Sequence, residues 1–244
     1  MRLNALDLVD YRLGRWQDAI GNTKADHLII DAPYSDRTHD GGRAGTIDGI
    51  DRVPVAAHYD SWGQQQVEEV CDWAAANVRQ WIVSMTDHAL WSVWERALLA
   101  RGYYVFAPVV LVETGRSVRL CGDGPACWST FLCVARPRTH AAMAWRALPG
   151  AYTVPASRDK MMGGKPLAAM RSIVRDYSDP GDTIVDLCAG NATTLLAAAE
   201  LGRRAIGCEM DPETWAKGKK RLTDRLHLPL LDRRPREQRN AELF

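Results

Sequence analysis

Two short stretches of this chain combine residue types that can do chemistry. The first is Asp31-Ala32-Pro33-Tyr34, which follows the apolar run at residues 25–30. Because proline cannot continue a central ladder, we expect a buried strand to end here and a loop to follow. A carboxylate accepts hydrogen bonds from a donor group, and a tyrosine ring offers a face for stacking. The same residue types are also common in ordinary strand-end turns, so the motif alone leaves both interpretations open.

The second stretch is the turn Ala189-Gly190-Asn191, which is followed along the chain by Glu209. Where a strand enters a helix through a tight glycine turn, the free N–H groups of the helix start can face a ligand. An acid that ends the next strand can accept hydrogen bonds from ribose hydroxyls. Dinucleotide enzymes normally carry G-x-G-x-x-G at this place, whereas this turn has a single glycine. We therefore expect a ligand that carries adenosine without phosphates, and not a dehydrogenase cofactor.

The elements that must position these residues alternate between strands and helices. Apolar spacing and end signals predict helices at 64–78, 89–101, 166–177, 193–201 and 212–226. They predict strands at 25–30, 81–85, 104–113, 128–136, 183–187 and 204–211. The strands at 104–113 and 128–136 should form an antiparallel pair, and the last two strands with their helix should form a βαβ unit. Residues 35–57 have no period and predict a long, mobile surface loop.

Composition bounds the class of protein. A chain of 244 residues with 46% apolar residues can bury one core, and its formal net charge of +1 means that any nucleic-acid surface must be a local patch. The six cysteines form no C-x-x-C pair, so we expect no metal site and reduced thiols. There is no apolar run of membrane-spanning length and no leader pattern. We therefore expect a cytoplasmic protein that is not bound to a membrane.

The stretch at residues 163–211 resembles the C-terminal block of the β class of permuted DNA amino-methyltransferases. That pattern runs K-P, helix, D-x-x-A-G-x-x-T-T, helix, G-R-x-x-x-G-x-E. The positions in register are Lys165, Pro166, Asp186, Ala189, Gly190, Thr193, Thr194, Gly202, Arg203, Gly207 and Glu209. The chain departs from the common pattern at Leu187-Cys188 and at Asn191-Ala192.

The resemblance implies S-adenosylmethionine as the cofactor. Glu209 would bind the ribose hydroxyls, and Asp186 with Lys165 would hold the amino-acid end. The implied cofactor-binding residues are Lys165, Asp186, Ala189, Gly190, Asn191, Thr193, Thr194 and Glu209. Taken singly, Asp186 could instead cap a helix, and Lys165 could be a solvated side chain.

The resemblance also implies a catalytic role for residues 31–34, which stand where this class has D-P-P-Y; Ala32 replaces the first proline. An exocyclic amine is a poor nucleophile, so a site must accept hydrogen bonds from its N–H groups. Asp31 and the backbone carbonyl of Ala32 would be the acceptors, Pro33 would fix the turn, and Tyr34 would stack on a flipped base. Since the methyl donor is already activated, the step is a direct displacement and needs no cysteine nucleophile.

The implied fold is a single Rossmann-like α/β domain. Its seven-stranded sheet is mostly parallel with one antiparallel strand, and the catalytic half comes first in a permuted order. Residues 1–137 would form the catalytic half with the loop 35–57, and residues 138–164 a linker or short recognition segment. Residues 165–226 would form the cofactor-binding half, and 227–244 a basic tail.

DNA is the partner that the resemblance implies; a homodimer is also left open. Basic residues of the 35–57 loop could contact phosphates, namely Arg37, His39, Arg43 and Arg52. The same loop carries four aspartates, so a solvated loop of mixed charge is an equal alternative. Because 138–163 is too short for a recognition domain, we expect relaxed or very short sequence specificity and a steep salt dependence.

The interpretation that best accounts for these residues is methylation of adenine N6 in DNA, because a leading Asp is more typical of N6 enzymes and a leading Ser of N4 enzymes. Methylation of cytosine N4 is the nearest alternative. The same chemistry on RNA or on a protein amide is a further alternative, although it usually has the unpermuted order. A non-catalytic nucleic-acid-binding module with a degenerate cofactor pocket also stays open, because of the departures at Ala32, Cys188 and Asn191.

Overall fold

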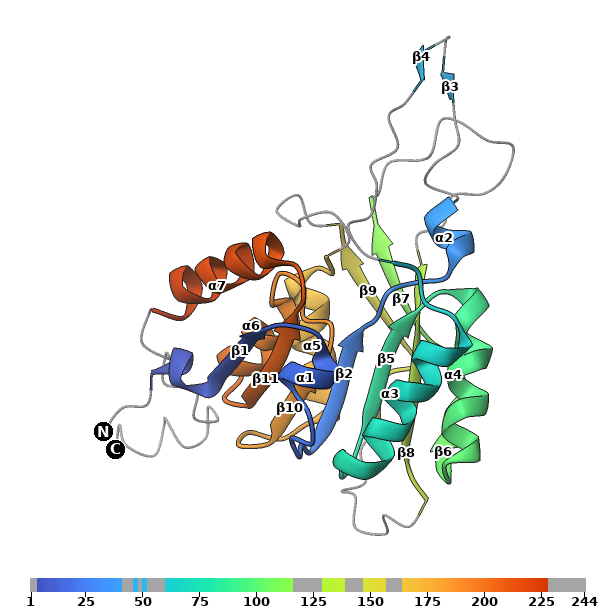
Figure 1. Cartoon of the computed structure of the whole chain (residues 1–244), viewed down its shortest axis with the longest axis horizontal. Helices are drawn as coiled ribbons and strands as arrows, with labels where there is room; N and C mark the ends of the chain where they lie inside the picture. Colours follow the sequence, from blue (N-terminus) through green and yellow to red (C-terminus); the bar gives the residue numbers. More distant parts are fainter. Residues whose placement is uncertain are drawn as a thin grey trace, which may run out of the picture.

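The computed structural model describes residues 4–40, 46–47, 50–51, 60–115, 129–138, 147–156 and 164–227. In these ranges one mixed sheet has helices on both faces (Figure 1). None of the described helices combines the length and the hydropathy needed to cross a membrane.

The main sheet contains nine strands among the described residues, and its order along the path is β1-β11-β10-β2-β5-β8-β7-β9, with β6 pairing β8. Their bounds are β1 Val9–Leu13, β2 His27–Asp31, β5 Ile82–Thr86, β6 Tyr103–Val105, β7 Val109–Thr114, β8 Ser129–Pro137, β9 Ala151–Pro155, β10 Thr183–Asp186 and β11 Arg204–Glu209. Outside this sheet, β3 (Thr46–Ile47) and β4 (Ile50–Asp51) form an antiparallel pair.

Strand directions agree with the predicted sheet, but the predicted count of seven was wrong. Strands β1, β11, β10, β2 and β5 are parallel, and β8 is antiparallel to β5, to β6 and to β7. Since β9 is parallel to β7, β8 alone among the described strands of this sheet runs against the rest. Two features raise the count to nine. The strand beside β8 is broken into β6 and β7 around Pro108, and β9 adds an edge strand.

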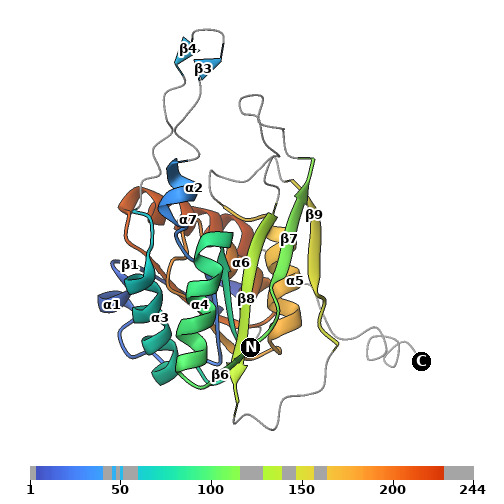
Figure 2. The same ribbon diagram turned by 90° about the vertical axis from the view of Figure 1, so that its right-hand side faces the viewer.

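The helices divide between the two faces of the sheet (Figures 1 and 2). Their bounds are α1 Trp16–Ala19, α2 Asp36–Asp40, α3 Gln64–Asn77, α4 His88–Ala100, α5 Leu167–Tyr177, α6 Thr193–Glu200 and α7 Pro212–Leu226, with a 3-10 turn η1 at Ala5–Leu8. Helices α3 and α4 bury one apolar cluster against the sheet, which includes Trp94 and Ile30. Helices α5, α6 and α7 bury the other, which includes Ile173 and Leu195.

Local sequence accounts for where several helices begin. Asp87 caps α4 by accepting hydrogen bonds from the N–H groups of Ala89 and Leu90. Asp211 caps α7 through Thr214 N–H, with Pro212 at the first helical position. Side-chain caps of this kind satisfy N–H groups that have no partner within the helix. Asp87 comes one residue after the end of β5, and Asp211 comes two residues after the end of β11. Both helices therefore begin at the same edge of the sheet.

The same edge carries the predicted functional residues. Strands β11, β10, β2 and β5 are parallel neighbours, and their carboxyl ends therefore meet. Glu209 ends β11, Asp186 ends β10 and Asp31 ends β2. Polar residues that lie far apart along the chain are in this way brought to a single edge, where ligands of open α/β sheets bind.

The described part of residues 35–57, which were predicted to form a long mobile loop, contains regular structure; the rest of this segment lies outside the described residues. Helix α2 forms at Asp36–Asp40, and β3 and β4 form within the same segment. Helix α2 has no apolar period that sequence analysis could detect. Tertiary hydrogen bonds hold it instead, since Ser35 and Thr38 both donate to Asp87.

Two edge strands were missed. The predicted linker at 138–164 contains β9, in which Tyr152 and Val154 face the core while the residues between and beside them are exposed. This alternation is too short to separate from a loop by pattern alone. Strand β1 was also not predicted, because it is a five-residue strand with two charged residues. Its pairing with β11 places Tyr11 opposite Gly207.

Candidate active site

Asp31 lies against the ammonium group of Lys165. The Lys165 Nζ is 2.7 Å from Asp31 Oδ1 and 2.8 Å from Oδ2. The lysine side chain is 8% exposed and the aspartate side chain 22%. Burial opposes the charge on Lys165, but the Asp31 carboxylate outweighs it and holds the pKa of Lys165 above its ordinary value. Asp31 is therefore held in place, while its side chain stays partly exposed.

Tyr34 belongs to the same cluster. Its hydroxyl makes a long contact of 3.5 Å with Asp31 Oδ1, and it also bonds to the side chains of Lys165 and Thr130. The Lys165 ammonium lies 5.0 Å from the centre of the Tyr34 ring, which is within cation–π range. Burial raises the pKa of Tyr34 to about 12, so its hydroxyl stays protonated as a donor.

The predicted cofactor turn has two residues in left-handed backbone conformations. Gly190 has φ +50° and Ala192 has φ +58°. For a residue with a Cβ this conformation costs roughly 1–2 kcal/mol, so neighbouring contacts must hold it. The Tyr11 hydroxyl donates to the Gly190 carbonyl at 2.5 Å, and Arg221 donates to the Asn191 carbonyl at 3.0 Å and to Thr193 Oγ1 at 2.7 Å.

Asp186 is buried beneath this turn. It accepts the Cys188 N–H at 3.0 Å and the Thr194 hydroxyl, and its side chain is 1% exposed. Burial raises its pKa to about 7 against these two bonds, and the nearby charges of Asp31 and Glu209 add to the rise. Asp31 and Asp186 end neighbouring strands of the sheet, β2 and β10.

Glu209 is half-buried at the end of β11. Its Oε1 accepts the Asp211 N–H at 2.8 Å, and the N–H groups of Met210 and Gly190 also bond to its carboxylate. Burial raises its pKa, and these backbone bonds oppose the rise. A carboxylate has about four acceptor positions, so Glu209 is oriented by backbone and can still accept a hydroxyl donor.

Gly207 provides close contact between the strand and the turn. A Cβ at this position would lie 2.9 Å from the Asp186 carbonyl oxygen and 3.0 Å from Ala189 Cβ. These distances are shorter than any ordinary contact, so this position admits only glycine without a shift of the backbone. Ala189 N–H also bonds to the Cys208 carbonyl at 2.9 Å, which fixes the turn onto β11.

One contact of Lys165 was not predicted. Lys165 is predicted to hold a ligand together with Asp186, and in the structure its ammonium bonds to Asp31. Its partner comes from a segment 134 positions away, so the sequence did not reveal the pair. The other predicted cofactor residues of this segment lie together: Ala189, Gly190 and Asn191 are in the turn after β10, and Thr193 and Thr194 begin α6. Of these, the side-chain oxygen of Asn191 is buried without a hydrogen-bond partner among the described residues.

The predicted DNA-contacting residues are only partly described. Arg37 is exposed on α2, close to the carboxyl end of β2. His39 lies on the same helix, but its side chain is outside the described residues, as are Arg43 and Arg52 entirely.

The cysteines in the described part of the chain have no features of nucleophiles. Burial raises the pKa of each of the four described ones, Cys71, Cys133, Cys188 and Cys208. A thiol with a raised pKa provides little thiolate at neutral pH. In the described part of the chain, no group of three or more His, Cys, Asp or Glu side chains could hold a metal.

Three further residues of this region were missed from sequence, namely Tyr11, Thr130 and Arg221. Tyr11 and Arg221 contact the turn from β1 and α7, near opposite ends of the chain, and Thr130 contacts Tyr34 from β8. None of them belongs to a local motif. Tyr11 and Thr130 reach this region only because the strand order places β1 beside β11 and β8 beside β5, and Arg221 reaches it from α7.

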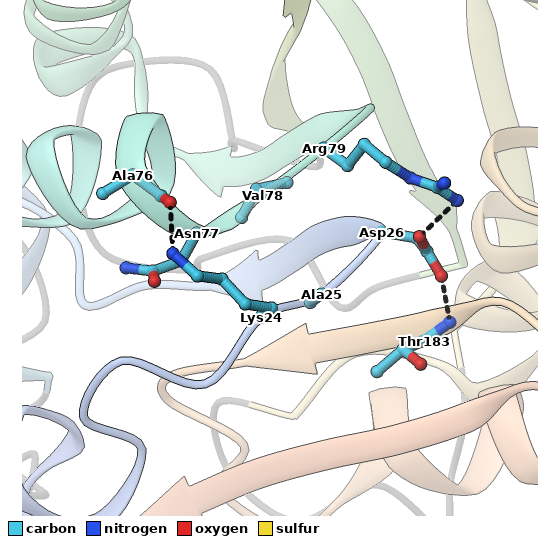
Figure 3. Close-up of a pocket in the computed structure, with 8 residues that line it drawn as sticks. All are labelled: Lys24, Ala25, Asp26, Ala76, Asn77, Val78, Arg79 and Thr183. Carbon is cyan, nitrogen blue, oxygen red and sulfur yellow. Dashed lines mark hydrogen bonds and ion pairs between the residues drawn. The ribbon is translucent and has the colours of Figure 1, made fainter.

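A separate cavity of about 480 Å³ opens at the amino ends of β2 and β10 (Figure 3). Its charged groups already have partners. Lys24 donates to the Ala76 carbonyl, and Asp26 pairs with Arg79 and accepts the Thr183 N–H. Strand β2 runs from this cavity to Asp31, so the cavity lies at the opposite end of the sheet from the candidate site.

Sequence comparisons match the second half of the chain to a known family. Residues 128–220 match the N6_N4_Mtase family model, described as DNA methylase. The type II methyltransferase M1.MboII of Moraxella bovis is 41% identical over 49 residues. These are 20% of this chain and only 19% of the length of that relative.

Solved structures share the fold over most of both chains. The complex of M1.HpyAVI with SAM has a TM-score of 0.66 at 19% identity and covers 88% of this chain and 99% of that one. A Thermus thermophilus protein described as a putative DNA modification methylase, complexed with S-adenosyl-L-methionine, has a TM-score of 0.64 at 16% identity, covering 89% and 94%. The cytosine-N4-specific PvuII DNA methyltransferase has a TM-score of 0.57 at 14% identity, covering 96% and 90%. At these identities the likeness establishes a common α/β fold.

Proposed function

We propose that this chain, whose residues 128–220 match the family model described as DNA methylase, methylates an exocyclic amino group of a base in DNA. The proposed methyl donor is S-adenosylmethionine, and the proposed target is adenine N6.

The observation that carries the proposal is the proximity of two acidic strand ends. Asp31 ends β2 and Asp186 ends the adjacent strand β10, and the charge of Asp31 contributes to the raised pKa of Asp186. A donor bound at the turn after β10 and an amine bound at Asp31 would therefore meet at one edge of the sheet. Proximity of this kind supplies much of the rate for a displacement that needs no covalent enzyme intermediate.

The residues of the cofactor turn fit an adenosine ligand that carries an amino acid. Glu209 is a hydrogen-bond acceptor for vicinal hydroxyls, and the Asn191 side-chain oxygen is a buried acceptor without a partner among the described residues. Asp186, whose pKa is raised to about 7, can supply negative charge near a cation. When bound, S-adenosylmethionine supplies a methyl group that is already activated on a sulfonium.

The residues around Asp31 would orient the amine. The Asp31 carboxylate would accept one N–H of the target amino group, and the Ala32 backbone carbonyl the other. Lys165 fixes the Asp31 carboxylate, and the Tyr34 ring would stack on the base. As the new N–C bond forms, the amine loses a proton, which Asp31 can accept or pass to water.

Adenine is the proposed base because an Asp leads the catalytic motif. In this family a leading Asp is more typical of N6 methylation and a leading Ser of N4 methylation. The test is methyl transfer from labelled S-adenosylmethionine to unmethylated duplex DNA, with mass spectrometry of the product nucleosides. We expect N6-methyladenine.

The control variants follow from the ion pair. Asp31→Asn keeps the volume but removes the charge, and it leaves the buried Lys165 ammonium without its partner. We therefore pair it with the double variant Asp31→Asn/Lys165→Gln, in which no unpaired charge is left. Both should bind the cofactor and transfer no measurable methyl group. N4-methylcytosine as the product would correct the base, and no methylated nucleoside from cofactor-bound protein would refute the proposed function.

A further inference from the structure

The peptide unit that follows the catalytic motif is held on both sides. It joins Tyr34 to Ser35, and its carbonyl oxygen accepts the Trp62 N–H at 3.1 Å. Its N–H donates to Asp87 Oδ2 at 3.0 Å. Trp62 precedes α3 and Asp87 precedes α4, so the starts of two helices determine the plane of this one peptide.

Asp87 makes more bonds than a helix cap requires. Its Oδ1 caps α4 through the N–H groups of Ala89 and Leu90, at 3.1 Å and 2.9 Å. Its Oδ2 accepts three further hydrogen bonds, from the Ser35 N–H and from the hydroxyls of Ser35 and Thr38, the last two at 2.5 Å. Oδ1 of Asp87 thus caps α4, and Oδ2 holds the segment from Ser35 to Thr38.

The carboxylate is buried and ionised. Asp87 is 8% exposed and Ser35 is also 8% exposed. Burial opposes ionisation of Asp87, but the bonds from Ser35 and Thr38 outweigh it and hold the pKa below its ordinary value. Bonds to an ionised acceptor in a buried place are stronger than neutral ones, so they define the position of Ser35 closely.

This arrangement restricts the backbone on both sides of Tyr34. Before Tyr34, the ring of Pro33 fixes the φ angle of that proline. After Tyr34, the peptide that joins it to Ser35 is held by Asp87 and by the Trp62 N–H. Asp87 directly follows β5, and β5 pairs with β2 from Leu28 to Asp31. The residue that bonds to Ser35 and the strand that carries Asp31 are therefore joined through the sheet. In Figures 1 and 2, α2 accordingly lies beside the start of α4.

We propose that Asp87 is a positioning residue for the target base, which sets the orientation of the Tyr34 ring and the start of α2 through Ser35 and Thr38. It touches neither the cofactor turn nor Asp31 in the described contacts. This inference rests on the proposed methylation of DNA, since it assigns to Asp87 the geometry of the base site of that reaction. The cap of α4 uses only Oδ1 of Asp87, so the bonds to Oδ2 are not needed for the cap.

The test compares three variants at a temperature well below their melting points. Asp87→Asn retains an oxygen for the α4 cap but replaces an acceptor with a donor. Ser35→Ala removes one of the three bonds to Oδ2 and leaves the cap intact. Asp72→Asn is the matched control, because Asp72 is an exposed aspartate on α3 that pairs with Arg101.

Three quantities are measured, namely the single-turnover rate at saturating DNA and cofactor, the dissociation constant for S-adenosylmethionine, and the fluorescence of 2-aminopurine placed at the methylated position. For Asp87→Asn we expect the rate to fall about ten- to a hundredfold, since small misplacements have effects of this size. Cofactor binding should stay within twofold, and the 2-aminopurine signal should decrease. Ser35→Ala should show a smaller loss in the same direction, and Asp72→Asn none.

The outcomes separate the two proposals. If Asp87→Asn melts at a lower temperature but keeps the wild-type rate and fluorescence, Asp87 is only a helix cap and the inference is wrong. If Asp87→Asn does not fold, Ser35→Ala decides, and a wild-type rate for it would overturn the inference. A wild-type protein that transfers no methyl group to DNA would overturn the proposed function and this inference with it.

Discussion

At the scale of single residues, Asp186 is a buried acid whose environment brings its titration into the neutral range. Burial raises its pKa from 3.8 to about 7, while the Cys188 N–H and the Thr194 hydroxyl favour the ionised form. Because the folded pKa exceeds the unfolded one, the folded protein keeps a proton that the unfolded chain loses. The contribution of Asp186 to stability therefore declines as pH rises between these two values.

The titration of Asp186 predicts a pH dependence of cofactor binding. A cationic ligand near the turn favours the ionised carboxylate, so affinity for S-adenosylmethionine should rise by up to about tenfold between pH 6 and pH 8. Isothermal titration at both pH values measures this change. In Asp186→Asn binding should be weaker and nearly independent of pH in this range. An unchanged slope in that variant would assign the titration to another group, such as Glu209, whose pKa is also raised by burial.

At the scale of elements, the cofactor turn depends on strands and helices that contribute nothing to its own sequence motif. Tyr11 from β1 and Arg221 from α7 hold the Gly190 and Asn191 carbonyls. Gly218 of α7 allows this approach, because a Cβ there would lie 3.0 Å from the Tyr11 hydroxyl. These bonds fix the turn that precedes α6, and N–H groups at a helix start can face a ligand.

Removal of the Tyr11 hydroxyl tests whether its bond to the Gly190 carbonyl supports the cofactor turn. Tyr11→Phe should lower the free energy of unfolding by about 1 kcal/mol, as for an ordinary hydrogen bond, and it should also weaken cofactor binding. Tyr152→Phe is the matched control, since the Tyr152 hydroxyl bonds to Asp176 away from the turn, at 3.0 Å. Chemical denaturation and cofactor titration measure both effects. Equal cofactor affinity in the two variants would mean that Tyr11 only stabilises the fold.

Gly207 tests the contact between β11 and the turn. Gly207→Ala places a Cβ against the Asp186 carbonyl and Ala189, so we expect a loss of about 1–3 kcal/mol in the free energy of unfolding. Gly150→Ala is the control, because a Cβ there meets nothing within 4 Å. Thermal melting of both variants measures the difference. A Gly207→Ala protein as stable as Gly150→Ala would show that the backbone of the turn can shift freely.

Elements whose patterns are local could be predicted from the sequence. The helix at 212–226 was predicted with its observed bounds, since Asp211 and Pro212 mark its start and its apolar face is periodic. The strand ends that carry Asp31, Asp186 and Glu209 were likewise predicted. Helix α2 and strand β9 were missed, because Asp87 and the neighbouring strand β7 determine them through contacts between distant segments. The Lys165–Asp31 pair was missed for the same reason.

At the scale of the whole molecule, a net charge of +1 provides no general attraction for DNA. Binding to phosphates must then depend on local groups near the edge that carries Asp31. Among the described residues, Arg37 is an exposed arginine at this edge, on the helix that Asp87 holds through Thr38. Arg79 lies at the opposite end of the sheet, where its side chain is 66% exposed and pairs with Asp26 (Figure 3).

These two arginines provide a matched test of where DNA binds. Arg37→Gln should weaken binding to all duplex sequences alike, and it should reduce the slope of log K against log salt by about one. Arg79→Gln removes the same charge at the far end and should leave the affinity and the slope unchanged. Fluorescence anisotropy over a salt series, with duplexes that contain and lack the methylated site, measures both quantities. If Arg79→Gln reduced the slope and Arg37→Gln did not, DNA would bind at the amino ends of the strands, and Asp31 could not reach a flipped base.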